Sequence, residues 1–244
     1  MVGETIDGTY RQTNLPNESK EYLAKREEIR LAEIELLNAR ERVAELRRQL
    51  PEGAILEDYE FVEGPTSLDE GDAPARKVRL SELFTVPDRS LVIDHLMYGK
   101  KNTKPCPMCT SWIDSFNGVA HHLAQNVDFA VVAAADLPEL RAFARARGWD
   151  KVRLLSAGDS TFKYDLGSED EEGQQDSTIS VFTRDKKGTL RHFYSVHPWI
   201  DKDIRERGID EWNPIWNVLD MTPQGRGSWY ASLDYGTKVQ AARK

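Results

Sequence analysis

Cysteine is scarce in this chain, which has only Cys106 and Cys109 among its 244 residues. Two cysteines exclude the multiple-disulfide framework of a small secreted domain. The sequence also lacks a run of about 18 apolar residues, so we expect no membrane-spanning helix. Acidic residues outnumber basic ones by 41 to 33, and the net charge of −8 argues against a nucleic-acid or anionic-membrane partner.

An export signal is likewise not expected. Residues 1–10 contain Glu4 and Asp7 and no apolar core of the signal-peptide kind. We therefore expect a cytoplasmic location, where reductants keep most thiols reduced. In that compartment a close cysteine pair is more often catalytic, redox-sensing or metal-binding than structural.

The two cysteines lie in the stretch PCPMCTSW, residues 105–112. If Cys106 is at the start of a helix and Cys109 one turn later, their sulfurs can approach to bonding distance without backbone movement. The free N–H groups and the positive dipole end of that turn would stabilise a thiolate on Cys106. Pro107 suits the first helical turn. The pattern predicts a redox-active pair, with an inert buried pair as the alternative.

Zinc binding is the competing chemistry for this pair. A tetrahedral zinc site needs four ligands. His121 and His122 are adjacent on the expected helix, so they point about 100° apart and lie some three turns beyond the cysteines. His192 or His197 would have to approach through the fold. We therefore expect no metal and no tightly bound cofactor.

Changes in composition divide the chain into four parts. Residues 1–17 are rich in Gly, Thr, Asn and Pro and predict a flexible tail. Residues 18–54 predict a charged amphipathic helix, capped by Asn17 or Ser19. Aromatic and β-branched residues increase from residue 55, and residues 55–236 predict one domain. Residues 237–244 are expected to be frayed.

The charged helix carries apolar residues every seven positions, with a second set three places later: Tyr22, Ile29, Leu36, Val43, Leu50, Ala32, Ala39 and Leu46. This spacing is typical of a coiled-coil seam. Lys25 interrupts its start, and other leucines widen it. One interpretation is an arm that forms a homodimer or binds a partner, and the other is a helix packed on its own domain.

The domain has strand patterns at residues 59–62, 90–97, 128–135, 151–156, 178–183 and 190–196, and helix patterns at 107–125, 137–147 and 200–217. Residues 76–84 resemble a strand entering a short helical turn, and residues 160–167 a turn. Strand, CxxC helix, strand, helix, strand and a final hairpin is a thioredoxin-like order. The predicted fold is therefore α/β, with a central mixed sheet flanked by helices.

Several sequence blocks resemble the thioredoxin-like family catalogued as domain of unknown function 899: YEFVEGP (59–65), LVIDHLMYG (91–99), CPMCTSWIDSFNG (106–118), DFAVVAAADLPEL (128–140), ISVFTRDKKGTLRHFYS (179–195) and LDMTPQGRG (219–227). The blocks occur in the family's order and cover most of residues 50–226. The resemblance implies a thioredoxin-like fold and a dithiol–disulfide activity.

The resemblance also implies residues that support the cysteines. Thioredoxins have a buried carboxylate under the thiols that assists proton transfer, and Asp94, on the strand before the motif, is the candidate for it here. Tyr98, at the active-site end of the same strand, could donate a hydrogen bond to a thiolate. Ser177 and Thr178 stand where relatives often carry Pro-Gly and where thioredoxins place a cis-proline opposite the CxxC. Met108 replaces a common glycine.

Other polar residues have interpretations that do not involve catalysis. Asp114 could accept a proton near Cys109, but a solvent-facing carboxylate is the expected state. Arg226 could bind an anion, but a solvated arginine is expected. Residues 168–175, SEDEEGQQ, predict a solvated acidic loop. His95 is expected to be a satisfied packing residue.

The sequence thus predicts a dithiol–disulfide oxidoreductase that acts on a protein or small-molecule disulfide. Cys106 would attack as a thiolate and Cys109 would resolve the mixed disulfide. A redox-inert thioredoxin-like binding module is one alternative, and a thiol peroxidase is another.

Overall fold

A computed structural model describes residues 5–6, 9–10, 15–86, 88–203 and 207–235 of the chain. Contacts divide the chain into two units, Met1–Pro51 and Glu52–Lys244. Each unit is described by itself, and the predicted four-part division stays a prediction. No helix among these residues is long and apolar enough to cross a bilayer. The tail predicted at residues 237–244 lies outside the described residues.

The first unit consists mainly of the helix α1 (Lys20–Arg48). Ser19 caps it: the side chain accepts a hydrogen bond from the backbone N–H of Tyr22 at 3.0 Å. The short strands β1 (Thr5–Ile6) and β2 (Thr9–Tyr10) pair antiparallel within the segment predicted as a flexible tail. The rest of that segment up to residue 14 lies outside the described residues.

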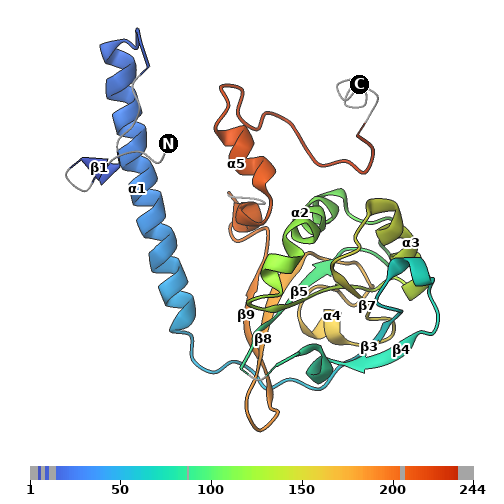
Figure 1. Ribbon diagram of the computed structural model, residues 1–244. Helices are drawn as coiled ribbons and strands as arrows, with labels where there is room; N and C mark the ends of the chain where they lie inside the picture. Colours follow the sequence, from blue (N-terminus) through green and yellow to red (C-terminus); the bar gives the residue numbers. More distant parts are fainter. Residues whose placement is uncertain (1–4, 7–8, 11–14, 87, 204–206, 236–244) are drawn as a thin grey trace. The chain divides into compact units, whose positions relative to one another are not determined.

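The second unit is built on a seven-stranded mixed sheet in the order β4-β3-β7-β6-β5-β8-β9 (Figure 1). Its strands are β3 (Glu60–Glu63), β4 (Arg76–Arg79), β5 (Leu91–Leu96), β6 (Asp128–Ala133), β7 (Arg153–Ser156), β8 (Thr178–Arg184) and β9 (Leu190–Val196). Strands β5, β6 and β7 are parallel, and their neighbours on both sides are antiparallel. This confirms the predicted α/β class with a mixed sheet.

Both faces of the sheet are covered, as the apolar runs of the central strands require. Along β6, Val131 and Ala133 pack with the helices α2 (Pro107–Leu123) and α3 (Leu137–Arg147). Ala130 and Val132 instead join Phe162 of α4 (Phe162–Asp165) and residues of the 3₁₀ turn Leu80–Leu83 on the other face. The alternation of side chains along a strand therefore divides β6 between two cores.

The carboxy-terminal region differs from the sequence prediction. The single helix expected over residues 200–217 is wrong: the structure has a 3₁₀ helix, Arg207–Trp212, and then α5 (Pro214–Asp220). Asn213 separates them and accepts a hydrogen bond from the N–H of Ile215 at 3.0 Å. Pro214 explains the break, because proline lacks the N–H that a continuous helix would need.

Candidate active site at the amino end of α2

Cys106 is the N-cap of α2, at the end of the loop that follows β5. Its sulfur accepts a hydrogen bond from the N–H of Cys109 at 3.5 Å, and its carbonyl accepts from Thr110 N–H at 3.0 Å. Pro107 occupies the first turn, as predicted. Free N–H groups and the positive dipole end of a 17-residue helix thus face the Cys106 sulfur. This geometry favours a thiolate on Cys106.

The loop before the motif reaches this position because Gly99 has no side chain. Its φ is +106°, and a Cβ there would lie 2.1 Å from the backbone N of Ala135. This close approach allows Tyr98 C=O to accept a hydrogen bond from Ala135 N–H at 2.9 Å. The N–H of Cys106 then donates to Met97 C=O at 3.1 Å. The end of β5 and the first residue of the motif are therefore held together.

The two cysteines have different surroundings. Both are free thiols; Cys106 is half-buried and Cys109 is fully buried. Burial raises the pKa of Cys109 well above its ordinary value, and the nearby Cys106 and Asp94 raise it further. In contrast, the hydrogen bond between the Cys109 sulfur and the Ser177 hydroxyl, at 3.5 Å, lowers that pKa. Accessibility thus favours Cys106 as the attacking sulfur and Cys109 as the second one.

Asp94 lies on β5 beneath the cysteines, and only 1% of its surface is exposed. Neither of its carboxyl oxygens has a hydrogen-bond partner within the described chain. Burial raises the pKa of Asp94 to about 7, against the opposing attraction of Lys163. A carboxyl group that titrates near neutral pH can accept and return a proton in the buried site.

Lys163 on α4 is the cation of this buried group, and it is fully buried. Its ammonium group donates to Leu96 C=O at 3.4 Å. Burial lowers its pKa to about 8, while Cys109 and Asp94 oppose that shift. Asp94, Cys109 and Lys163 therefore form one electrostatically coupled set, in which a proton change on one member alters the others.

His95 is adjacent to this set but has a mainly structural environment. Its Nδ1 lies 2.7 Å from the Ser168 hydroxyl, and its ring stacks on Phe162 at a centroid distance of 5.2 Å. Burial and the charge of Lys163 keep its pKa well below the ordinary value, so the ring is neutral at pH 7. Its Nε2 has no partner among the described residues. The prediction of a satisfied histidine is therefore wrong for Nε2.

Thr178 is the first residue of β8, the strand next to β5, and Ser177 directly precedes it. Thr178 is buried and faces His95 across the antiparallel pair, while Ser177 supplies the hydroxyl that contacts Cys109. Of these two residues, the structure thus brings Ser177 to the sulfur. The sequence prediction chose Thr178, one residue farther along.

Residues 12–240 match the family described as bacterial protein of unknown function (DUF899). The chain belongs to this family. No curated protein matches the DUF899 chain.

Solved structures with a similar fold are peroxiredoxin-like and related proteins. Reduced Prx3 in complex with H₂O₂ from Vibrio vulnificus has 17% identity and a TM-score of 0.45, covering 66% of this chain and 94% of the other. A peroxiredoxin-like protein from Aquifex aeolicus has 19% identity and a TM-score of 0.40, and the match covers 60% of this chain and 75% of the other. A putative thioredoxin reductase from Burkholderia cenocepacia has 20% identity and a TM-score of 0.42, and the match covers 59% of this chain and 87% of the other.

Tyr98, the second supporting residue predicted at the end of β5, has its neighbours on helix α3. Its ring packs near Phe143 of α3, at a centroid distance of 6.1 Å. Burial and the nearby Glu139 raise the pKa of its hydroxyl. These contacts place Tyr98 with α3, and none of them involves a cysteine sulfur.

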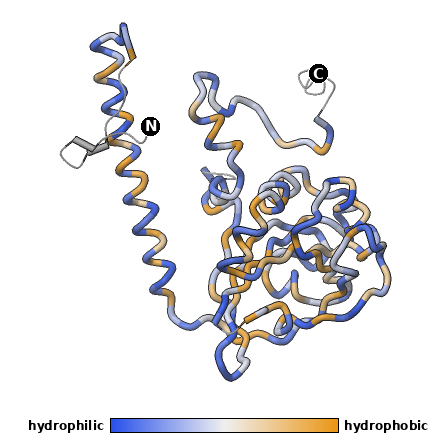
Figure 2. Tube along the Cα trace, in the orientation of Figure 1, coloured by the Kyte–Doolittle hydropathy of each residue, from blue (hydrophilic) through white to orange (hydrophobic). Residues whose placement is uncertain are grey.

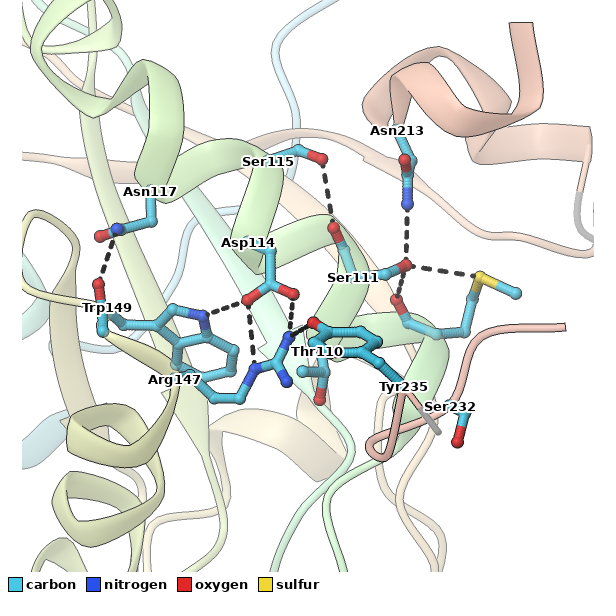
Figure 3. A network of polar contacts seen from close by, with 12 residues as sticks. Thr110, Ser111, Asp114, Ser115, Asn117, Arg147, Trp149, Asn213, Ser232 and Tyr235 are labelled. Atoms are coloured by element: carbon cyan, nitrogen blue, oxygen red, sulfur yellow. Dashed lines mark hydrogen bonds and ion pairs between the residues drawn. The ribbon is translucent and has the colours of Figure 1, made fainter. Parts of the chain in front are cut away.

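Asp114 is also different from the solvated carboxylate that was expected. It accepts hydrogen bonds from the indole N–H of Trp149 at 2.8 Å and from the guanidinium of Arg147, which also contacts Tyr235 (Figure 3). A cavity of about 220 Å³ lies between Pro107 and the group Asp114, Arg147 and Tyr235. Asp114 is therefore an ion-paired residue that links α2 to α3.

Two further surface predictions are corrected by the structure. Arg226 forms ion pairs with Asp210 and Asp220 and lies over the ring of Trp216, so it is neither solvated nor free for an anion. The acidic segment 168–175 is solvated only in its middle, because its end residues Ser168 and Gln175 are buried. Through Ser168 the segment contacts His95.

The same acidic segment also holds the loop that leads to the cysteines. Glu169 forms an ion pair with Lys100, and the N–H of Gln175 donates to the Asn102 side chain at 2.8 Å.

Within the described residues no three His, Cys, Asp or Glu side chains are arranged to hold a metal ion. The residue that sequence reasoning missed is Lys163, because a charged side chain is expected in solvent even where it lies between Phe162 and Tyr164.

Proposed function

We propose that this protein is a dithiol–disulfide oxidoreductase that cycles Cys106 and Cys109 between dithiol and disulfide. The observation that carries the proposal is the arrangement of the pair: a half-buried N-cap cysteine, and a buried cysteine one turn later beside an unpartnered carboxyl group. If the pair were inert, there would be no chemical reason for a helix N-terminus at the more exposed Cys106 sulfur. There would also be no reason for the ionisable carboxyl group of Asp94 near Cys109.

The proposed reaction has two exchange steps. The Cys106 thiolate attacks one sulfur of a substrate disulfide, so that an S–S bond forms to Cys106 and the second substrate sulfur leaves as a thiolate and takes a proton. Cys109 then loses its proton and attacks the Cys106 sulfur, which releases the first substrate sulfur. Two electrons pass from the protein dithiol to the substrate, and an external thiol reductant restores the dithiol.

The buried carboxyl group has a role in the second step. Cys109 must lose a proton although its pKa is raised by burial. Asp94 is coupled to Cys109 and has a pKa of about 7, so its carboxylate form can receive that proton. The positive charge of Lys163 would stabilise the anionic states that occur during the transfer. Asp94 and Lys163 thus support the reaction without touching the substrate.

The proposal is tested by redox titration of the full chain in buffers of defined thiol–disulfide ratio. We expect the mass to fall by two hydrogens in a single transition between roughly −120 and −300 mV, the range of known redox proteins. We also expect faster reduction of a model disulfide than free dithiol gives. A chain that forms no internal disulfide in this range would instead be a redox-inert binding module.

Ser177→Ala is expected to slow the second exchange step roughly tenfold, because a hydrogen bond to a charged group contributes about 1.5–3 kcal/mol. In the reduced protein the Cys109 S–H donates to the Ser177 oxygen; after deprotonation the hydroxyl can donate to the thiolate. Stopped-flow decay of a mixed disulfide on Cys106 measures the rate. Ser177→Thr keeps the hydroxyl and is the control; equal rates in all three proteins would exclude this role.

A further inference from the structure

Within the first unit, helix α1 presents exposed apolar side chains. None of its residues is buried, and Ile29, Leu36 and Val43 are 53%, 52% and 42% exposed. Figure 2 shows apolar residues along the whole length of the helix. Exposed apolar side chains repeated over 29 residues indicate a surface that is covered in use. The spacing of seven between these three residues places them on one line along the helix.

We propose that the seam containing this line pairs with the same seam of a second copy of the chain, and that the two helices run antiparallel. The seam consists of this line and of a second line three residues later, Ala32, Ala39 and Leu46. In an antiparallel pair, the first line of one copy faces the second line of the other copy. Setting Leu36 opposite Ala39 of the second copy also sets Val43 opposite Ala32 and Ile29 opposite Leu46. Large side chains then face small ones in the middle of the pair, which allows close packing.

Charges beside the seam favour this orientation. In the antiparallel register Glu35 faces Arg42 of the second copy, and Glu33 faces Arg40, and symmetry repeats each contact. Each of these pairs joins opposite charges. Glu33 and Glu35 lie about two turns before Arg40 and Arg42, so the antiparallel arrangement places the acidic pair of one copy against the basic pair of the other.

A parallel pair would be less favourable. It would bring Glu28 beside Glu33 and Arg42 beside Arg47, two contacts between like charges. These would offset its two contacts between opposite charges, Glu21 with Arg26 and Glu35 with Arg40. The antiparallel register has one such contact, between Arg26 and Arg47. Its cost is reduced because Arg26 is already paired with Glu18 of its own chain at 2.8 Å.

The first test measures the mass of the full chain in solution by sedimentation equilibrium. We expect a dimer, and we expect Leu36→Glu to raise its dissociation constant at least roughly 100-fold, because the change removes two buried leucines and adds two charges per dimer. Ile34 is the matched control: it is 40% exposed on the opposite side of the helix, so Ile34→Glu should leave the dimer intact. A monomer in the wild type, or equal effects of the two variants, would overturn the proposal.

The second test determines orientation. A spin label on Glu27→Cys, in a chain with Cys106→Ser and Cys109→Ser, reports the distance between the two copies. In the antiparallel register residue 27 of one copy lies on the outer side of the pair, level along the axis with residue 48 of the other copy. The two labels therefore lie about 30 Å apart along the axis, from 21 residues at 1.5 Å each. Labels in a parallel pair would have no separation along the axis, and their distance would come only from the helix spacing of about 10 Å, the outer halves of the two helices and the label arms. The shorter distance would overturn the antiparallel arrangement.

A charge exchange provides an independent check of the register. Glu35→Arg should weaken the dimer because it places a positive charge at position 35 of one copy against Arg42 of the other. Adding Arg42→Glu restores opposite charges and should restore the dimer. Failure of the second change to rescue the first would contradict the proposed contact. Glu35 and Arg42 lie outside the cysteine site, so disulfide reduction by these charge variants can be measured independently of their dimerisation.

Discussion

Replacing Cys106 with serine is expected to abolish disulfide reduction, whereas replacing Cys109 with serine should leave the first exchange step intact. Cys106 is the more exposed sulfur and is the N-cap of α2. Serine is a much weaker nucleophile at neutral pH, and the buried Cys109 cannot take over, because burial both blocks access and raises its pKa. The loss in rate should reach the background given by free reductant alone.

Cys109→Ser should accumulate a mixed disulfide between Cys106 and the substrate, since the resolving thiol is missing. Intact-mass measurement after incubation with a model disulfide detects this adduct, and the same variant can capture substrates for identification. Ser115→Ala is a suitable control on the same helix, because its hydroxyl only donates to Ser111 C=O at 3.1 Å. Retained activity in Cys106→Ser, or adducts on Cys109 in place of Cys106, would contradict the assigned roles.

The sequence alone predicts local features of this chain well where a single residue type determines them. Helix α3 has the predicted bounds because Pro138 lies in its first turn and Gly148 ends it in the left-handed conformation, at φ 71°. Cys106 is at the start of a helix because the next residue is proline. Such signals depend on neighbouring residues and not on the rest of the fold.

Features that depend on contacts between distant segments were not predictable in the same way. Lys163 carries a charge that predicts exposure to solvent, yet the fold buries it beside Asp94, 69 positions earlier in the chain. Asp114 was expected in solvent because its partners Arg147 and Trp149 belong to another part of the chain. A pattern of residue types reports which side chains can be buried, but it does not report which charges meet after folding.

Asp94→Asn is expected to change the pH dependence of stability more than any other single substitution at the site. The pKa of Asp94 is about 7 in the folded protein, against an ordinary value of 3.8. Between these two pH values the unfolded chain is ionised and the folded chain still holds the proton. The folded state therefore binds more protons, and the free energy of unfolding must fall as pH rises through this range.

The size of this fall follows from the pKa difference. About 3 pH units correspond to roughly 4 kcal/mol between pH 4 and pH 8, at about 1.4 kcal/mol per unit. Asparagine does not titrate, so Asp94→Asn should lack this loss, while ionisable groups outside the coupled set of Asp94, Cys109 and Lys163 contribute equally to both proteins. Urea denaturation of both proteins at several pH values gives the difference directly. If the free energy of unfolding changed equally with pH in both proteins from pH 4 to pH 8, Asp94 would not be the buried titrating group.

The same substitution should also slow the second exchange step, because Cys109 loses its proton acceptor. In the wild type we expect the resolving rate to rise with pH around 7 as Asp94 ionises. In Asp94→Asn that rise should disappear, leaving only the rise due to ionisation of the thiol at higher pH. Lys163→Met is the matched comparison: removing the neighbouring cation should raise the pKa of Asp94 further and move the rise to higher pH without abolishing it. A general loss of packing would not distinguish the two variants in this way.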